Sequence, residues 1–309
     1  MVLSIRLFIV SPILLLLFFP LFVSGSTTGV ALAPTKTVTY CSPGGINLLM
    51  DLYLPSHVSG SPAVILIHAG GLISGSRQTI EGTRAKLIAA LVKSGYVVAP
   101  IDYRLGPDYG YLAQVQDVEC AVRYLRANAM TYKINTKEIG LYGDSAGGYL
   151  ALMVASSQPA FNVGPNLKYS GAVEAVVDVS GPTDLSTIIA QADPKAPQAI
   201  PTLTTFIDTA TDSEDPNTAM LRAASPISYV STRTSPSLML YGLNDTLVAY
   251  AQGVEMQNAM QHVGIKSQLI LVNNAGHVLN PISTNPHFAE TPSQTQILQD
   301  EVSFFNEYL

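Results

Sequence analysis

A serine flanked by glycines stands between two runs of apolar residues, and its placement constrains the fold more than any other feature. The run Ile139–Tyr142 predicts a short buried strand, and the run from Ala146 to about Ser156 predicts a helix that follows at once. Between them, Gly143-Asp144-Ser145-Ala146-Gly147 fits the pattern G-x-S-x-G. A turn this tight leaves no room for a side chain at either glycine. A strand, a tight turn and a helix form a nucleophile elbow, so we predict that Ser145 is a nucleophile.

Runs that predict strands alternate with runs that predict helices along most of the chain. The predicted strands are 35–41, 46–54, 63–67, 96–101, 139–142, 173–179, 237–241 and 267–272, and the predicted helices are 83–93, 112–127, 146–156, 249–263 and 292–308. The first two strands flank a tight turn, so we expect them to form an antiparallel edge. With the elbow, this order predicts the α/β-hydrolase fold: a mostly parallel sheet of about eight strands with helices on both faces.

The composition excludes several classes of protein. Hydrophobic residues make up 48% of the 309 residues, which is enough to bury a large core and argues against disorder. The net charge is −6 and no basic run is present, so we expect neither nucleic acid nor an anionic membrane surface as a partner. No group of Cys and His has the spacing of zinc ligands, and we predict no metal and no organic cofactor.

The first 25 residues predict a secretory signal peptide. Arg6 is their only charge, a mostly apolar run follows at Leu7–Val23, and small residues come next at Ser24-Gly25-Ser26. The alternative is an uncleaved membrane anchor, which is the one case in which we expect a membrane partner. Both interpretations predict a secreted or extracytoplasmic protein, with a short leader at 26–34 and one catalytic domain at 35–309.

Two cysteines, Cys41 and Cys120, are the only ones in the chain. An exported protein could join them in a disulfide. Cys41 lies near an early predicted strand and Cys120 on a predicted helix, and nothing in the sequence brings the two together. We therefore expect two separate buried thiols.

The segment His68-Ala69-Gly70-Gly71 directly follows the third predicted strand. In the α/β-hydrolase fold the loop at this place supplies a backbone donor to the oxyanion hole. Glycines let the backbone approach a substrate closely. We predict that the N–H groups of Gly70, Gly71 and Ala146 form the oxyanion hole, and that His68 is a hydrogen-bonded scaffold residue.

A serine nucleophile needs a base, and in this fold the base is a histidine that comes last in the chain. His277 follows the last predicted strand after the short loop 273–276, which places it at the carboxyl edge of the sheet. His287, in a proline-rich stretch, is the reserve candidate. His262 lies on a predicted helix and is expected at the surface.

The orienting carboxylate comes between the serine and the histidine in this fold. Asp245 follows the predicted strand 237–241 after a turn of three residues, so it too should reach the carboxyl edge. Asp184 is the reserve candidate. The prediction is that His277 takes the Ser145 proton, that Asp245 holds the imidazole tautomer, and that water then releases the acyl group.

These residues together resemble a known family. The set comprises His68-Ala69-Gly70-Gly71, Asp102-Tyr103-Arg104-Leu105, Gly143-Asp144-Ser145-Ala146-Gly147-Gly148, Asp245 and Gly276-His277. It is similar to the hormone-sensitive-lipase-like esterases, and most similar to their compact secreted branch of bifunctional acetylxylan/feruloyl (BD-FAE-like) esterases. The usual loop of the family is His-Gly-Gly-Gly, and Ala69 replaces its first glycine. The predicted donors match the second and third glycines. Arg104 is expected to be structural and paired with a carboxylate.

The larger relatives in this family carry an N-terminal helical cap, for which this chain has no room before its first predicted strand. The segment 181–235 shows no clear period and is the only candidate for a small lid. One hypothesis is that it lines an acyl pocket through Ile188, Ile189, Leu203 and Phe206. The alternative is a packed excursion with no role in binding.

The sequence predicts a serine carboxylic ester hydrolase for short acyl esters, and it leaves the natural substrate and the oligomeric state open. One alternative is an acetylxylan or feruloyl esterase, although the absence of Trp argues mildly against a tight grip on long glycans. A peptidase or amidase would need a large extra domain. The alternative from another class is a catalytically silent binding protein of the same fold, which the complete candidate triad disfavours.

Overall fold

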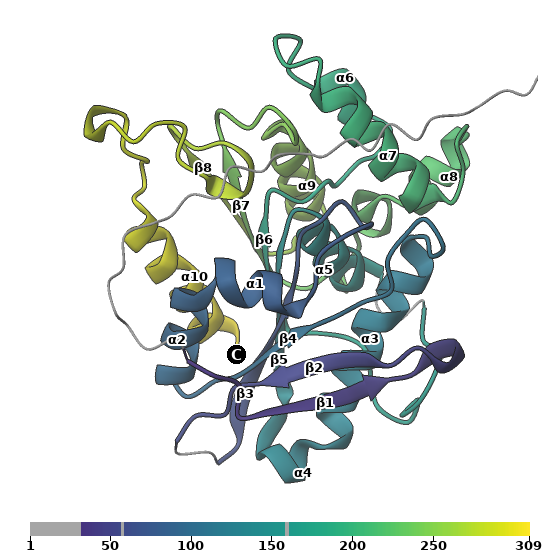
Figure 1. Cartoon of the computed structure of the whole chain (residues 1–309), viewed down its shortest axis with the longest axis vertical. Coiled ribbons are helices and arrows are strands. Elements are labelled where there is room, and N and C mark those ends of the chain that lie inside the picture. The colour runs from purple at the N-terminus through teal and green to yellow at the C-terminus, as the bar shows by residue number, and fades with distance from the viewer. Residues whose placement is uncertain (1–31, 57–58, 158–160) are drawn as a thin grey trace, which may run out of the picture. The chain divides into compact units, whose positions relative to one another are not determined.

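The computed structural model describes residues 32–56, 59–157 and 161–309. The predicted signal peptide and most of the predicted leader therefore lie outside the described residues. The described chain forms one eight-stranded sheet in the order β1-β2-β4-β3-β5-β6-β7-β8 (Figure 1). Among the described residues, no helix has both the length and the apolar character needed to cross a bilayer.

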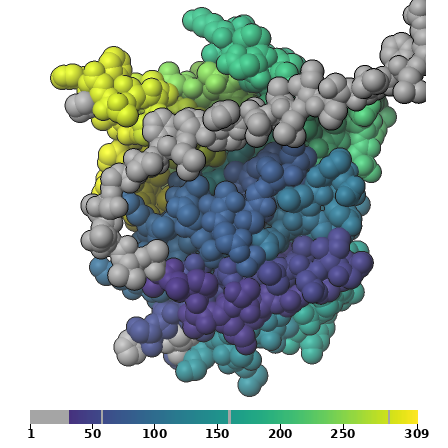
Figure 2. Space-filling model, in the orientation of Figure 1, coloured from purple at the N-terminus to yellow at the C-terminus, as the bar shows by residue number. Residues whose placement is uncertain are grey.

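The strands pair as the sequence predicts. They are β1 (Lys36–Cys41), β2 (Leu48–Leu52), β3 (Ser61–Ile67), β4 (Val97–Ile101), β5 (Ile134–Asp144), β6 (Ala175–Val179), β7 (Ser237–Gly242) and β8 (Ser267–Val272). Strand β2 pairs antiparallel with both β1 and β4, and all other pairs are parallel. The segment of the β1–β2 hairpin, drawn in purple, crosses the lower part of the view in Figure 2. The mostly parallel sheet with an antiparallel N-terminal edge is thus confirmed.

Helices cover both faces of the sheet. They are α1 (Arg77–Thr83), α2 (Ala85–Lys93), α3 (Tyr111–Ala127), α4 (Ala129–Tyr132), α5 (Ala146–Ser157), α6 (Ile188–Gln191), α7 (Ala199–Thr211), α8 (Thr218–Ala223), α9 (Ala251–His262) and α10 (Gln294–Tyr308), with short 3₁₀ turns η1 (Pro43–Gly45), η2 (Pro226–Tyr229), η3 (His277–Leu279) and η4 (Pro286–Phe288). Helix α1 was not expected, because its polar sequence buries only Ile80 and carries no apolar period.

The central strands are buried on both sides because they supply side chains to two cores. In β3, Ile65 and Ile67 join the core beneath α3 and α5, whereas Val64 and Leu66 join the core beneath α1, α2 and α10. Successive strand residues point to opposite faces, so a strand between two helical layers must be apolar throughout. This is why the continuous apolar runs of the sequence predict the parallel strands well.

The candidate lid segment 181–235 is partly helical. Helices α6, α7 and α8 come from it and lie near one another at the top of the view in Figure 1. The first and last are only four and six residues long, which is too short to show a helical period. Ile188, Leu203 and Phe206 are buried in the core, and Ile189 is 38% exposed. A role for this segment in lining an acyl pocket stays a prediction.

The expectation of two separate thiols is wrong, because Cys41 and Cys120 form a disulfide. Cys41 ends strand β1, and Cys120 lies near the middle of α3, with their Cα atoms 6.3 Å apart. Both cysteines are buried in the core that lies between this helix and the sheet. Their meeting depends on how α3 is rotated against the hairpin, which spacing along the chain does not reveal.

We predict that removing this disulfide destabilises the fold. The two cysteines are 79 positions apart in the sequence, and a disulfide that closes so long a loop strongly restricts the unfolded chain. Such a bond typically adds about 2–4 kcal/mol to the free energy of unfolding. The double variant Cys41→Ser/Cys120→Ser should show that loss in urea unfolding. Reduced wild-type protein is the matched control and should unfold like the double variant. Two thiols that react in the denatured, unreduced protein would contradict the disulfide.

Candidate active site

Ser145 occupies a sharp turn between strand β5 and helix α5. Its φ is 52°, in the left-handed region, and its amide donates to the carbonyl of Val179 at 2.7 Å. A Cβ at Gly143 would lie 2.2 Å from the backbone of Gly147, and one at Gly147 would lie 2.1 Å from the carbonyl oxygen of Ile67. Only glycine fits at these two positions, so the motif fixes where the serine hydroxyl emerges.

The hydroxyl of Ser145, the imidazole of His277 and the carboxylate of Asp245 form one chain of hydrogen bonds. Nε2 of His277 lies 2.8 Å from Oγ of Ser145, and its Nδ1 lies 2.8 Å from Oδ2 of Asp245. Asp245 follows β7, and His277 opens η3 after β8. The structure therefore brings together three side chains that the sequence places at the carboxyl ends of three different strands.

The carboxylate of Asp245 is held from two sides. Its Oδ1 accepts hydrogen bonds from the amides of Leu247 and Val248, both at 2.9 Å, while Oδ2 faces the imidazole. The Asp245 side chain is fully buried, whereas that of His277 is 24% exposed. Buried amide donors stabilise an ionised carboxylate and fix its orientation. The carboxylate thereby orients the imidazole, which stays partly exposed.

The loop after β3 carries the two glycines whose amides are predicted oxyanion donors. Gly70 and Gly71 have φ values of 128° and 60°. The Gly70 carbonyl accepts from the amides of Ile73 and Ser74, which curls the loop, and a Cβ on Gly70 would lie 1.9 Å from the carbonyl oxygen of Ser74. Ala146 begins α5, where amides have no partner within the helix. These three amides belong to segments that adjoin the serine turn.

His68 and Arg104 are scaffold residues, as expected. The His68 ring is 1% exposed, stacks on Tyr103 at 4.2 Å and donates from Nδ1 to the carbonyl of Ala69. Burial lowers the pKa of His68, which favours the neutral ring. Arg104 forms a forked ion pair with Asp117 on α3. Both side chains hold the loops after β3 and β4 through contacts that do not include Ser145.

The reserve candidates do not join the triad. His287 lies in the separate turn η4, and Asp184 bonds locally to the amide and hydroxyl of Ser186. His262 is exposed at the end of α9, as expected. Among residues 32–309, with the two short gaps in the description left aside, no cluster of His, Cys, Asp or Glu could hold a metal ion.

Asp178 is a buried acid beneath the elbow that sequence reasoning missed. A Cβ on Gly148 would lie 2.0 Å from its Oδ1, which places the carboxyl directly under the start of α5. The amide of Gly181 donates to it at 2.9 Å, and the hydroxyl of Tyr241 lies 2.9 Å away. Burial raises the pKa of Asp178 to about 7, although both hydrogen bonds favour its ionised form. The only sequence signal for this residue is a single acidic side chain within an otherwise apolar strand.

A small cavity lies beside the serine turn. It has a volume of about 160 Å³, and its walls include Ala69, Asp144 and Val278, each adjacent in sequence to a predicted site residue. Ile80 and two threonines of the α1 region, Thr79 and Thr83, close another side. The cavity is smaller than the roughly 300–1,000 Å³ of sites for drug-sized ligands. Arg84 also lines it, whereas Ser145 and His277 do not, so the cavity adjoins the triad without containing the reacting groups.

We predict that Asp178 makes the fold less stable as the pH rises. Its folded pKa of about 7 exceeds the ordinary value, so the native state binds the extra proton and stability falls from about pH 4 to about pH 7. The full effect is roughly 4 kcal/mol at about 1.4 kcal/mol per pKa unit. Asp178→Asn should lose less stability between about pH 5 and about pH 8 in urea unfolding than wild type does.

Exposed Asp108→Asn is the matched control for this measurement, and its stability should follow the wild-type pH dependence. Other buried carboxyls with raised pKa values, such as Glu301 and Glu119, add the same slope to every variant. The difference between Asp178→Asn and wild type therefore isolates Asp178. Parallel pH curves for these two proteins would contradict a protonated Asp178.

The chain is similar in sequence to known esterases. A sequence model of the BD-FAE family matches residues 50–260. Esterase LipQ of Mycobacterium tuberculosis is 29% identical over 242 residues, which cover 75% of this chain and 54% of LipQ. The chain spans about half the length of the curated esterases that it matches.

Solved structures share the fold. A truncated carbohydrate esterase from gut microbiota has a TM-score of 0.72 at 26% identity, covering 89% of this chain and 97% of that one. An acetyl ester-xyloside bifunctional hydrolase from Caldicellulosiruptor lactoaceticus has a TM-score of 0.71, covering 90% and 98%, but at 17% identity it shows only the fold. Because the family match extends over more than half of the sequence, this chain belongs to the BD-FAE family.

Proposed function

We propose that this protein is a serine carboxylic ester hydrolase that forms an acyl-enzyme on Ser145. The observation that carries the proposal is the continuous chain of hydrogen bonds from Ser145 through His277 to Asp245, with both links at 2.8 Å. A hydroxyl, an imidazole and a buried carboxylate in this order activate a serine for attack on an acyl carbon.

The steps follow from the positions of these groups. Nε2 of His277 accepts the Ser145 proton as Oγ attacks the ester carbonyl, and Asp245 stabilises the imidazolium that forms. The amides of Gly70, Gly71 and Ala146 stabilise the oxyanion of the tetrahedral intermediate. His277 then protonates the departing alcohol. The same imidazole deprotonates a water molecule, which attacks the acyl carbon and forms a second tetrahedral intermediate. Collapse of this intermediate releases the acid, and His277 returns the proton to Oγ of Ser145.

The comparisons support an ester as the substrate, because relatives such as LipQ and LipC, and a neighbour of 26% identity, are described as esterases. The candidate lid segment supports a short acyl group, because Ile188, Leu203 and Phe206 pack into the core rather than face an open site. A catalytically silent binding protein would have no need for a hydrogen-bonded triad. The geometry therefore favours hydrolysis over binding alone.

An acetylxylan or feruloyl esterase is the second candidate. The neighbours described as a carbohydrate esterase and as an acetyl ester-xyloside hydrolase favour it. An acetylxylan esterase and a general short-chain esterase accept the same small acyl group, so the leaving alcohol separates these two. A feruloyl esterase differs also in its large aromatic acyl group.

We also propose that the protein works outside the cytoplasm. The disulfide between Cys41 and Cys120 supports this, since structural disulfides persist in oxidising compartments. The apolar N-terminal segment with its single Arg6 supports the same proposal from the sequence. A small ester is the only partner that we propose, and no metal or cofactor is needed for the steps above.

We predict that Ser145→Ala lowers kcat/KM for p-nitrophenyl acetate by at least about a thousandfold, because the nucleophile is lost. Urea unfolding should stay close to wild type, since the hydroxyl contributes little to packing. Ser228→Ala, at an exposed serine, is the matched control and should keep full activity. Turnover by Ser145→Ala at the wild-type rate would rule out the proposed nucleophile.

We predict a preference for short acyl chains in a series of p-nitrophenyl esters from acetyl to decanoyl. Because Leu203 and Phe206 of the candidate lid pack into the core rather than face an open site, kcat/KM should be at least about tenfold lower for decanoyl than for acetyl or butyryl esters. A feruloyl ester and acetylated xylan, assayed on the same preparation, separate general and cell-wall esterases. A rate that rises toward decanoyl would instead indicate a lipase.

A further inference from the structure

The guanidinium of Arg84 lies behind the nucleophile elbow and contacts both segments that carry reacting side chains. Its Nε and Nη2 donate to the carboxylate of Asp144 at 2.7–3.0 Å, in a forked ion pair. Nη2 also lies 3.5 Å from the carbonyl oxygen of Val278, a longer and weaker contact. Asp144 precedes Ser145, and Val278 follows His277. One side chain thus joins the residue before the nucleophile to the residue after the base.

Both segments have strained backbone at this point. Ser145 and Val278 have φ values of 52° and 50°. A left-handed conformation is costly for a residue with a side chain, and most of all for a β-branched valine. Such residues persist only where surrounding contacts hold them. The amide of Val278 donates to Oγ of Ser180 at 3.2 Å, and Arg84 supplies the contact at its carbonyl.

Arg84 keeps its charge in this position. Burial lowers the pKa of Arg84, but Asp144, Tyr142 and Glu301 together more than offset that effect, and the net shift is upward. The guanidinium also lies over the ring of Tyr142, 5.6 Å from its centre, and the Tyr142 hydroxyl donates to Glu301. A permanent cation with a fixed fork geometry can hold two acceptors at a set distance, which an ammonium cannot do as well.

We propose that Arg84 is a positioning residue that sets the distance between the Ser145 hydroxyl and the His277 imidazole. It acts through Asp144 and Val278 and touches no reacting atom. The inference rests on the triad proposed above. Moving a reacting group by about 1 Å can cost a hundredfold in rate, so a small change at Arg84 should reach the chemistry.

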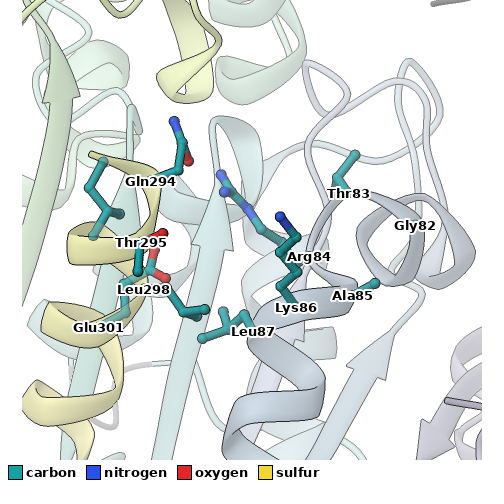
Figure 3. Close-up of a pocket in the computed structure, with 11 residues that line it drawn as sticks. Gly82, Thr83, Arg84, Ala85, Lys86, Leu87, Gln294, Thr295, Leu298 and Glu301 are labelled. Carbon is teal, nitrogen blue, oxygen red and sulfur yellow. The ribbon is translucent and has the colours of Figure 1, made fainter. Parts of the chain in front are cut away.

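A cavity outside the triad gives access to this guanidinium. It lies between the start of α2 and helix α10 and has a volume of about 390 Å³. Figure 3 shows Arg84 and Lys86 projecting from the start of α2, with Gln294 and Glu301 on α10 across from them. Removing the Arg84 side chain would open a space continuous with this cavity. A free guanidinium ion could then occupy the vacated position beside Asp144.

The test compares Arg84→Ala and Arg84→Lys with the same substitutions at Arg104. Arg104 is the matched control because its forked ion pair with Asp117 has a similar exposure, 13% against 15%, and does not touch the triad. We expect kcat of Arg84→Ala for p-nitrophenyl acetate to fall by roughly 10- to 100-fold with KM little changed. The rate of phosphorylation of Ser145 by paraoxon should fall in parallel. Arg104→Ala should lose stability but keep kcat.

Chemical rescue separates positioning from a merely structural role. Guanidinium chloride, added far below denaturing concentrations, should restore much of the kcat lost in Arg84→Ala, and the same concentration of sodium chloride should not. It should have no effect on Arg104→Ala. Arg84→Lys keeps the charge beside Asp144 but loses the fork, so its kcat should stay several-fold below wild type.

Three results would overturn the inference. The first is wild-type kcat in Arg84→Ala, and the second is full kcat in Arg84→Lys. The third is a loss of kcat that follows the loss of stability equally in the Arg84 and the Arg104 variants. If Arg84→Ala does not fold, Arg84→Lys decides the question alone. Failure of the proposed function is distinct, because Ser145→Ala would then remain active.

Discussion

The left-handed backbone of Ser145 is the constraint on which the rest of the site depends. A residue with a side chain in this conformation costs about 1–3 kcal/mol, so its neighbours must hold it there. The glycines on either side let α5 approach the end of β3 within backbone contact distance, and the Val179 carbonyl fixes the serine amide. The direction of the hydroxyl follows from this turn. The loops after β7 and β8 then meet it from the neighbouring strands.

Three aspartates lie close to this turn, and the fold treats each one differently. Asp245 is ionised in the proposed mechanism and accepts from two amides and an imidazole. Asp144 faces the guanidinium of Arg84. Asp178 faces an amide and a tyrosine hydroxyl rather than a cation in the described part of the chain, and burial favours its neutral form. Opposite charge, directed donors and protonation are three ways to keep a carboxyl in a low-dielectric interior. Using all three avoids a concentration of negative charge behind the nucleophile.

The positions of strands and site residues could be predicted from the sequence where local pattern and chain order carry the information. The motif around Ser145 needs only a strand and a helix on either side, and His277 and Asp245 follow from the ends of the last two strands. Contacts between distant elements could not be predicted in this way. Arg84 meets residues 60 and 194 positions away, and Cys41 meets Cys120 across 79 positions. Those pairs depend on the rotation and tilt of helices, which a one-dimensional pattern does not encode.

The covalent bridge from β1 to α3 divides the catalytic apparatus into two groups. The ring closed by Cys41 and Cys120 contains Gly70, Gly71 and Arg84, whereas Ser145, Asp245 and His277 all follow it in the chain. The disulfide therefore constrains the segment that supplies two of the three proposed amide donors and the Arg84 guanidinium. The triad and Ala146 lie in the part of the chain that continues beyond the ring. Reduction would thus act directly on the segment of the glycine donors, and on the nucleophile only through the backbone and packing that follow Cys120.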